Sequence, residues 1–145
     1  MTTTAPTLNA RVIALAHNAA RTLAEGALTR HGITFHQSVT LRTVAVAGGT
    51  LARQALVAEV TDALKTPASL VEDVIGELTT TGLLHPLDES LTLTDTGRDL
   101  YEATAAATAG IAARLYAGIP AEDLAVAGRV LTLITDRANA ELAAP

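Results

Sequence analysis

Residues 65–100 read KTPASLVEDVIGELTTTGLLHPLDESLTLTDTGRDL, and this stretch carries the clearest pattern of helix, turn and hairpin in the chain. Thr66-Pro67 is typical of a helix start, with Thr66 as the N-cap and proline at the first helical position. Apolar residues then recur at helical spacing on one face, at Leu70 or Val71, Val74, Ile75 and Leu78. The pattern predicts a helix to about residue 81, which Gly82 ends.

A short hairpin is expected next. Residues 84–87 and 90–94 read as two strands around a turn at Asp88-Glu89. Pro86 cannot donate a ladder hydrogen bond, so the first strand must lie at an edge. Thr94 can then cap a further long helix.

The same reading extends outward in both directions. Helices are predicted over residues 8–30, 35–46 and 51–64, with breaks at His31-Gly32 and Gly48-Gly49. Beyond the hairpin, Gly118 and Pro120 separate helices over 94–117 and 121–143. Four helices, a hairpin and two helices predict a mainly α, winged helix-turn-helix fold with a short β-hairpin wing.

Composition sets the class of the molecule. A length of 145 residues predicts one domain, and the 49% apolar residues are mostly Ala, Leu and Val, as in packed helices. The absence of Cys excludes thiol nucleophiles and thiolate metal sites. The first six residues lack the features of a signal peptide, and no run of residues has the length of a membrane helix. We therefore expect a cytoplasmic protein with no membrane partner.

The first and last helices carry apolar stripes too wide for a small core to cover. The stripes contain Leu8, Val12, Leu15, Ala19 and Leu23 in one helix, and Leu124, Ala127, Leu131, Ile134 and Ala138 in the other. Such helices usually bury each other across a two-fold axis, so a homodimer is expected. The alternative is a monomeric bundle.

Three motifs carry a resemblance to a known family. Gly82-Leu83-Leu84 is similar to a "GLV" between recognition helix and wing, and residues 91–100 are similar to "LT-x-x-G-R-x-L" leaving the wing. Residues 32–37 with Leu41-Arg42 are similar to "GLT-x-x-Q…LR". On these motifs the chain resembles the MarR family of dimeric winged-helix regulators.

The resemblance implies an architecture and a function. Residues 8–31 and 100–143 would be dimerisation helices, and residues 34–99 the winged-helix lobe, of a single domain over 1–145. It also implies a small-molecule-responsive transcriptional regulator with pockets between the dimerisation helices and the DNA-binding lobes.

The chain departs from the family in its charge. Residues 66–97 contain no Lys or Arg but six acids, at Glu72, Asp73, Glu77, Asp88, Glu89 and Asp95. The basic wing tip of the family is missing, and residues 84–91 are too short for its usual long wing. Because Lys and Arg contacts to phosphate supply most non-specific affinity, this local charge disfavours DNA binding.

The residues expected nearest to DNA are therefore few. Arg53, Lys65 and Arg98 are the cations that could lie near a duplex, and Thr66 and Ser69 are hydroxyls that the resemblance places near a groove. Alternatively, Arg98 supports the structure of the wing and does not contact DNA.

The candidate ligand residues gather around the second helix. They are His17, Phe35, His36, Arg42 and Tyr101. Arg42 could hold an anionic group by a bidentate contact, and His36 could donate a hydrogen bond or exchange a proton near neutral pH. The expected ligand is thus a small apolar or anionic molecule. In the alternative interpretation, Arg42 pairs with a carboxylate and the histidines lie on the surface.

Catalytic and cofactor motifs are not recognisable. The chain lacks G-x-S-x-G, H-E-x-x-H, a phosphate loop and a dinucleotide fingerprint, so no cofactor is predicted. A metal site would need partners beyond His31 and His36, and none is predicted.

Two functions remain open from the sequence. The first is a MarR-like regulator with weak DNA-binding chemistry. The second is a MarR fold reassigned to bind or transform a hydrophobic metabolite without binding DNA.

Overall fold

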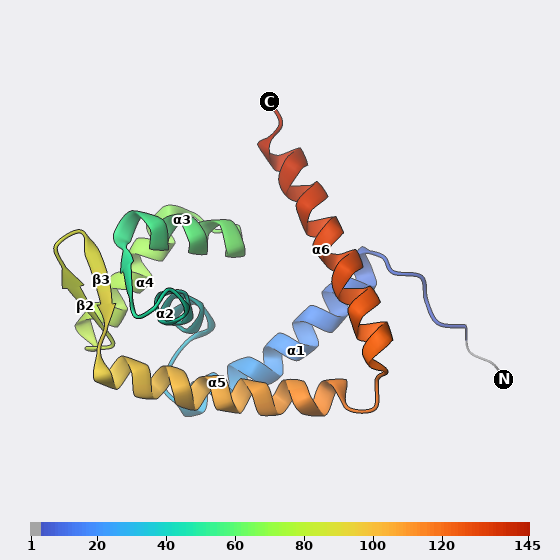
Figure 1. The fold of residues 1–145 in the computed structure, drawn as a ribbon, viewed down its shortest axis with the longest axis horizontal. Coiled ribbons are helices and arrows are strands. Elements are labelled where there is room, and N and C mark those ends of the chain that lie inside the picture. Colours follow the sequence, from blue (N-terminus) through green and yellow to red (C-terminus); the bar gives the residue numbers. More distant parts are fainter. Residues whose placement is uncertain (1–3) are drawn as a thin grey trace. The chain divides into compact units, whose positions relative to one another are not determined.

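The computed structural model describes residues 4–145; its six helices follow one another in the predicted order, and the chain also forms a small antiparallel sheet (Figure 1). Residues 1–3, part of the segment expected to lack a targeting signal, lie outside the described residues. The elements are α1 (Ala10–Arg30), α2 (Phe35–Val46), β1 (Thr50–Ala52), α3 (Arg53–Leu64), α4 (Ala68–Thr80), β2 (Leu84–Leu87), β3 (Ser90–Leu93), α5 (Asp95–Tyr116) and α6 (Ala121–Ala143). The mainly α, winged helix-turn-helix prediction is confirmed.

The chain forms two compact units that divide within α5. The first unit extends to Ile111 and contains the four preceding helices and the sheet. The second begins at Ala112 and contains the end of α5 and the whole of α6. The single domain expected from the chain length therefore stays a prediction.

Side-chain caps fix where three helices begin. The Asn9 carboxamide oxygen accepts from the Val12 backbone N–H at 2.9 Å, so α1 starts at Ala10 and Leu8 precedes it. Thr34 and Gln37 form a reciprocal capping box at the start of α2, with hydrogen bonds of 3.1 and 3.0 Å. The Thr94 hydroxyl accepts from the Gly97 N–H at 2.9 Å, which confirms its predicted capping role.

Like the predicted start of α1 at residue 8, two further predicted helix starts were wrong. Residues 51 and 52 belong to β1, because the strand pairs with β3, so α3 begins at Arg53. Thr66 does not cap α4. Pro67 occupies that position and the helix begins at Ala68. The physical reason is that Lys65 adopts a left-handed conformation (φ 52°), and a residue before proline is pushed towards extended geometry.

The sheet has one strand more than the hairpin that the sequence predicts. Its order is β1-β3-β2, and both pairings are antiparallel. Leu51 faces Leu91 across one pairing, and Leu84 faces Leu93 across the other. Pro86 lies on β2, which is an edge strand as predicted.

The core of the first unit is formed by α2, α3, α4 and the inner face of the sheet. Its fully buried side chains include Leu41, Val44, Leu56, Val60, Val71, Ile75, Leu78, Leu84 and Leu91. Val71 is buried while Leu70 is 36% exposed, which decides between the two positions left open on α4. Because one face of α4 packs in this core, the opposite face points to solvent.

The outer helices carry apolar side chains that the single chain leaves uncovered. Leu15 and Leu23 on α1 are more than half exposed, although the sequence pattern placed both on an apolar face. Within residues 4–145, no α6 residue is buried, and Leu131 and Ile134 are about 40% exposed. The homodimer stays a prediction. No helix among the described residues is long and apolar enough to cross a membrane.

Candidate functional site

The helix-turn-helix is formed by α3 and α4, joined at Lys65. Val71, Val74, Ile75 and Leu78 hold α4 in the core, so its remaining positions face outward. Ser69, Glu72, Asp73 and Glu77 are exposed. The solvent-exposed face of α4 therefore carries three carboxylates and no cation.

Two of the predicted DNA-contacting cations are paired with acids inside the lobe. Arg53 Nη1 lies 2.6 Å from Oε2 of Glu72, which joins the start of α3 to α4. Lys65 Nζ lies 3.0 Å from Oδ1 of Asp62 in the preceding turn. Charge-assisted contacts of this length direct both cations towards carboxylates of the protein.

The wing turn approaches Arg53 from the other side. The Arg53 backbone N–H donates to the Glu89 carbonyl oxygen at 2.9 Å. Asp88 has a left-handed backbone (φ 54°) in the same turn. Both acids and Arg53 line a concavity of about 370 Å³ with Ala52 and Gln54. Arg53 is thus the guanidinium at the junction of α3, α4 and the wing.

The other residues predicted to contact DNA lie apart from the Arg53 junction, on different elements. Ser69 is exposed in the first turn of α4, and Thr66 is half-buried in the α3–α4 connection. Arg98 is exposed on α5, and its Nη2 lies 2.9 Å from where a Cβ on Gly49 would stand. This close approach to the α2–β1 turn agrees with the bracing alternative for Arg98.

A second concave region lies at the α1–α2 junction. A cavity of about 330 Å³ is lined by Glu25, Thr29, Gly32, Ile33, Thr34 and Phe35. The Arg21 guanidinium stands 4.0 Å from the centre of the Phe35 ring, and Arg21 Nε donates to Glu25 Oε1 at 2.9 Å. The His36 ring meets Phe35 edge-on, with centroids 6.0 Å apart. This arrangement combines an apolar wall with one anion and one cation.

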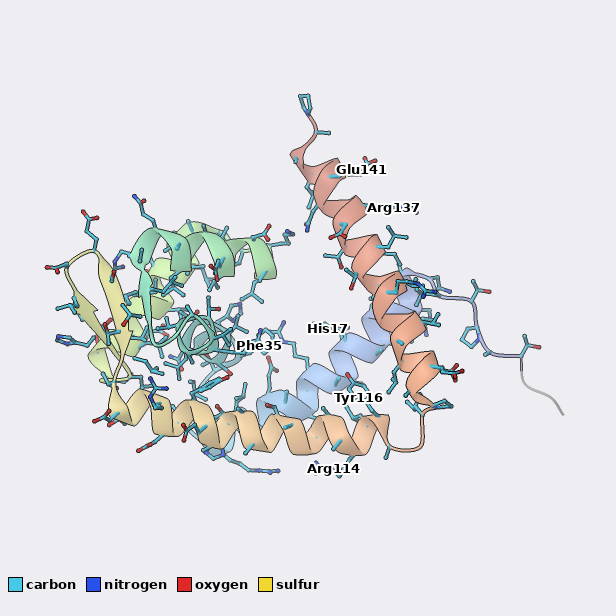
Figure 2. All side chains as sticks on the ribbon, viewed as in Figure 1. His17, Phe35, Arg114, Tyr116, Arg137 and Glu141 are labelled. Carbon is cyan, nitrogen blue, oxygen red and sulfur yellow. The ribbon has the colours of Figure 1, made fainter. Side chains whose placement is uncertain are left out.

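The five predicted ligand residues are not gathered around one cavity of the first unit. Phe35 lines the α1–α2 cavity and His36 contacts it, whereas His17 is exposed on α1 (Figure 2). Arg42 is exposed and lines a separate depression of about 400 Å³ with Val46 and Glu59. Tyr101 is half-buried against the core. Their assignment to a single ligand stays a prediction.

Sequence reasoning missed Arg21 and Glu25 at the α1–α2 cavity. Their spacing of four residues on one helix was a visible signal for an ion pair. The contact of Arg21 with Phe35 had no such signal, because it depends on how α2 returns beside α1. Among the described residues, no group of three or more His, Asp or Glu side chains could hold a metal ion.

Comparison with solved structures places this architecture. No protein-family model and no curated protein matches the chain. Ligand-free NadR superposes with a TM-score of 0.78 over 94% of this chain and 100% of its own, at 20% identity. CouR from Rhodococcus jostii RHA1, bound to p-coumaroyl-CoA, gives a TM-score of 0.73 at 17% identity, over 86% of this chain and 88% of its own.

A third structure is a MarR family protein of Mycobacterium tuberculosis, Rv2887, in complex with DNA. Its TM-score is 0.67 at 22% identity, over 88% of this chain and 98% of its own. The same protein is also known in complex with salicylic acid. Since these likenesses extend over nearly the whole chain at low identity, they establish the fold: the chain has the winged helix-turn-helix fold of the MarR regulators.

Proposed function

We propose that the chain is a homodimeric, small-molecule-responsive transcriptional regulator that binds DNA weakly. The observation that carries the proposal is the exposed face of α4 beside a wing, in a fold that Rv2887 presents in complex with DNA. The N-terminal turns of α3 and α4 would offer backbone N–H groups to phosphates. Arg53, Lys65 and Arg98 would add cationic contacts, and Thr66 and Ser69 hydroxyl contacts.

The weakness follows from the charge of α4. A carboxylate held about 4 Å from a phosphate costs about 4 kcal/mol at an effective dielectric near 20, before salt screening. Glu72, Asp73 and Glu77 are all exposed on this helix. Because two nearby cations are already paired with acids, the attraction left for phosphate is small.

The ligand response is proposed to begin at the α1–α2 cavity. Phe35 and Ile33 supply apolar lining and Glu25 supplies a carboxylate there. The His36 ring and the Arg21 guanidinium lie next to this lining, because both contact Phe35. His17, Arg42 and Tyr101 remain proposed contacts of the same ligand. A ligand that binds one arrangement of the two lobes better than another would shift the dimer population and so change its fit to DNA.

Variants of single cations test the regulator proposal. We expect Lys65→Ala to weaken binding of a DNA duplex and to reduce the salt dependence of the affinity by about one phosphate contact. Arg53→Ala should weaken binding less and leave the salt dependence nearly unchanged, because the Glu72 carboxylate already holds this guanidinium. Arg30→Ala removes the same charge from the exposed end of α1 and should leave both quantities unchanged. Unchanged affinity in the first two variants would discard the proposed DNA surface.

The paired cations also favour a second candidate function. In this alternative the fold binds or transforms a hydrophobic metabolite and has no DNA partner. It predicts no DNA binding even at low salt, together with saturable binding of an aromatic probe such as salicylate. DNA binding that is selective for one sequence would exclude it.

A further inference from the structure

The contact between Arg53 and Glu72 should affect DNA affinity in a way that the net charge of the chain does not predict. We propose that Glu72 restrains Arg53 and thereby sets how tightly this lobe binds DNA. The inference rests on the proposed regulator function and concerns its strength.

The position of Arg53 makes it the cation that matters most. Its backbone is fixed by the hydrogen bond to Glu89 of the wing turn, and its side chain reaches Glu72 on α4. Residues 66–97 provide no Lys or Arg, so neither α4 nor the wing has a cation to replace it. Arg53 alone brings a guanidinium to α4 among the described ion pairs.

A phosphate would compete directly with the Glu72 carboxylate. Both groups accept bidentate hydrogen bonds from the planar guanidinium fork. The Arg53 and Glu72 side chains are 43% and 47% exposed, so a DNA backbone can approach the pair from solvent. Exposed ion pairs are weak, and the contact can therefore open.

Opening the Arg53–Glu72 pair nevertheless adds little to the DNA affinity of the wild-type lobe. When Arg53 turns to a phosphate, Glu72 is left unpaired beside the DNA and repels it. The gain of one attraction is offset by one repulsion. Removing Glu72 would leave the attraction and abolish the repulsion.

Neighbouring acids on α4 allow a matched test. Asp73 is exposed like Glu72, so alanine at either position removes one negative charge from the same helix face. Among the hydrogen bonds and ion pairs of residues 4–145, only Glu72 of these two acids contacts Arg53. A difference between the two variants therefore reports the release of Arg53.

The measurement is duplex DNA affinity across a salt series for five proteins: wild type, Glu72→Ala, Asp73→Ala, Arg53→Ala and the double variant of Arg53 and Glu72. We expect Glu72→Ala to raise low-salt affinity about tenfold, with a salt slope steeper by about 0.9 for each Arg53 that gains a phosphate. Asp73→Ala should raise the low-salt affinity about threefold and leave the salt slope unchanged. In the Arg53→Ala background, the gain from Glu72→Ala should fall to the Asp73→Ala value. Circular dichroism would verify that each variant is folded.

Each result decides. Equal gains from Glu72→Ala and Asp73→Ala, or a gain from Glu72→Ala that persists without Arg53, would overturn the inference while leaving the regulator function intact. Absence of DNA binding in both wild type and Glu72→Ala would overturn the inference and the regulator function together. Binding that appears only in Glu72→Ala supports the restraint of Arg53 and contradicts the regulator function of the wild-type protein.

Discussion

Gly97 shows how a residue of a recognisable motif is required by packing. A Cβ at this position would lie 2.1 Å from the Leu83 carbonyl oxygen and 2.9 Å from Leu93 Cδ1. The glycine therefore lets α5 start directly against the end of the α4–β2 connection. The sequence supplied the "LT-x-x-G-R" pattern, but the reason for glycine depends on a backbone contact 14 positions away, which no local pattern reveals.

We expect Gly97→Ala to lower the free energy of unfolding by about 3 kcal/mol, because backbone must move to relieve the clash. Gly76→Ala is the control. It lies in α4 with nothing within 4 Å of its added Cβ, so it should stabilise the protein by about 1 kcal/mol. Urea denaturation measures both values. Similar effects of the two substitutions would contradict the packing of Gly97.

The predicted ligand residues mark the limit of sequence reasoning at this scale. Phe35 and His36 are adjacent in sequence and in contact. Arg42 lies further along α2 and lines another depression, because the helix turns it away from the α1–α2 cavity. Ligand binding by variants of Arg42 and His36 tests which of the two side chains contacts a ligand.

Salicylate and its neutral amide, salicylamide, are suitable probes for this question. If Arg42 holds an anionic group, Arg42→Ala should weaken salicylate binding about tenfold and leave salicylamide binding unchanged. His36→Ala should weaken the binding of both probes. Arg30→Ala serves as the charge control, and calorimetry gives the affinities. Normal binding of both probes by both variants would remove Arg42 and His36 from the site.

At the scale of elements, agreement with the sequence depends on whether the signal is local. The bounds of α2 match the prediction, since Thr34 and Gln37 form a capping box that can be read from the sequence. β1 was missed because three residues show no periodicity and their partner strand lies about 40 positions away. The hairpin was predicted because its turn and edge proline are local signals.

Thr94 joins three elements and provides a test at this scale. Its hydroxyl donates to the Gly82 carbonyl at 2.6 Å and accepts from the Gly97 N–H at 2.9 Å, so it links α4, the wing and α5. Thr94→Ala should lower the free energy of unfolding by about 1–2 kcal/mol. Thr96→Ala, an exposed threonine two residues later, should change it by less than about 0.5 kcal/mol. Equal losses would show that the Thr94 cap contributes little.

At the scale of the whole molecule, α6 is the unexplained element. Among the described residues its apolar side chains Leu124, Val126, Leu131, Leu133 and Ile134 are all at least 37% exposed. The sequence pattern predicted this stripe, but the pattern cannot name what covers it. A second copy of the chain is our prediction.

The predicted dimer should have twice the chain mass of 14.9 kDa in light scattering. Leu131→Asp would place a charge in the apolar face of α6 and should yield monomers or a marked loss of stability. Leu87→Asp, at an exposed leucine of the wing, should leave the mass unchanged. A monomeric wild-type protein would contradict the dimer and leave the bundle alternative.

The most direct test of the regulator function is DNA binding by the purified wild-type protein, at low and at physiological salt. The duplexes are the region upstream of its own gene and a random sequence of equal length. We expect selective binding to the upstream region that is weak and falls steeply as salt increases. No binding to either duplex at low salt would contradict the regulator function and leave the metabolite-binding alternative.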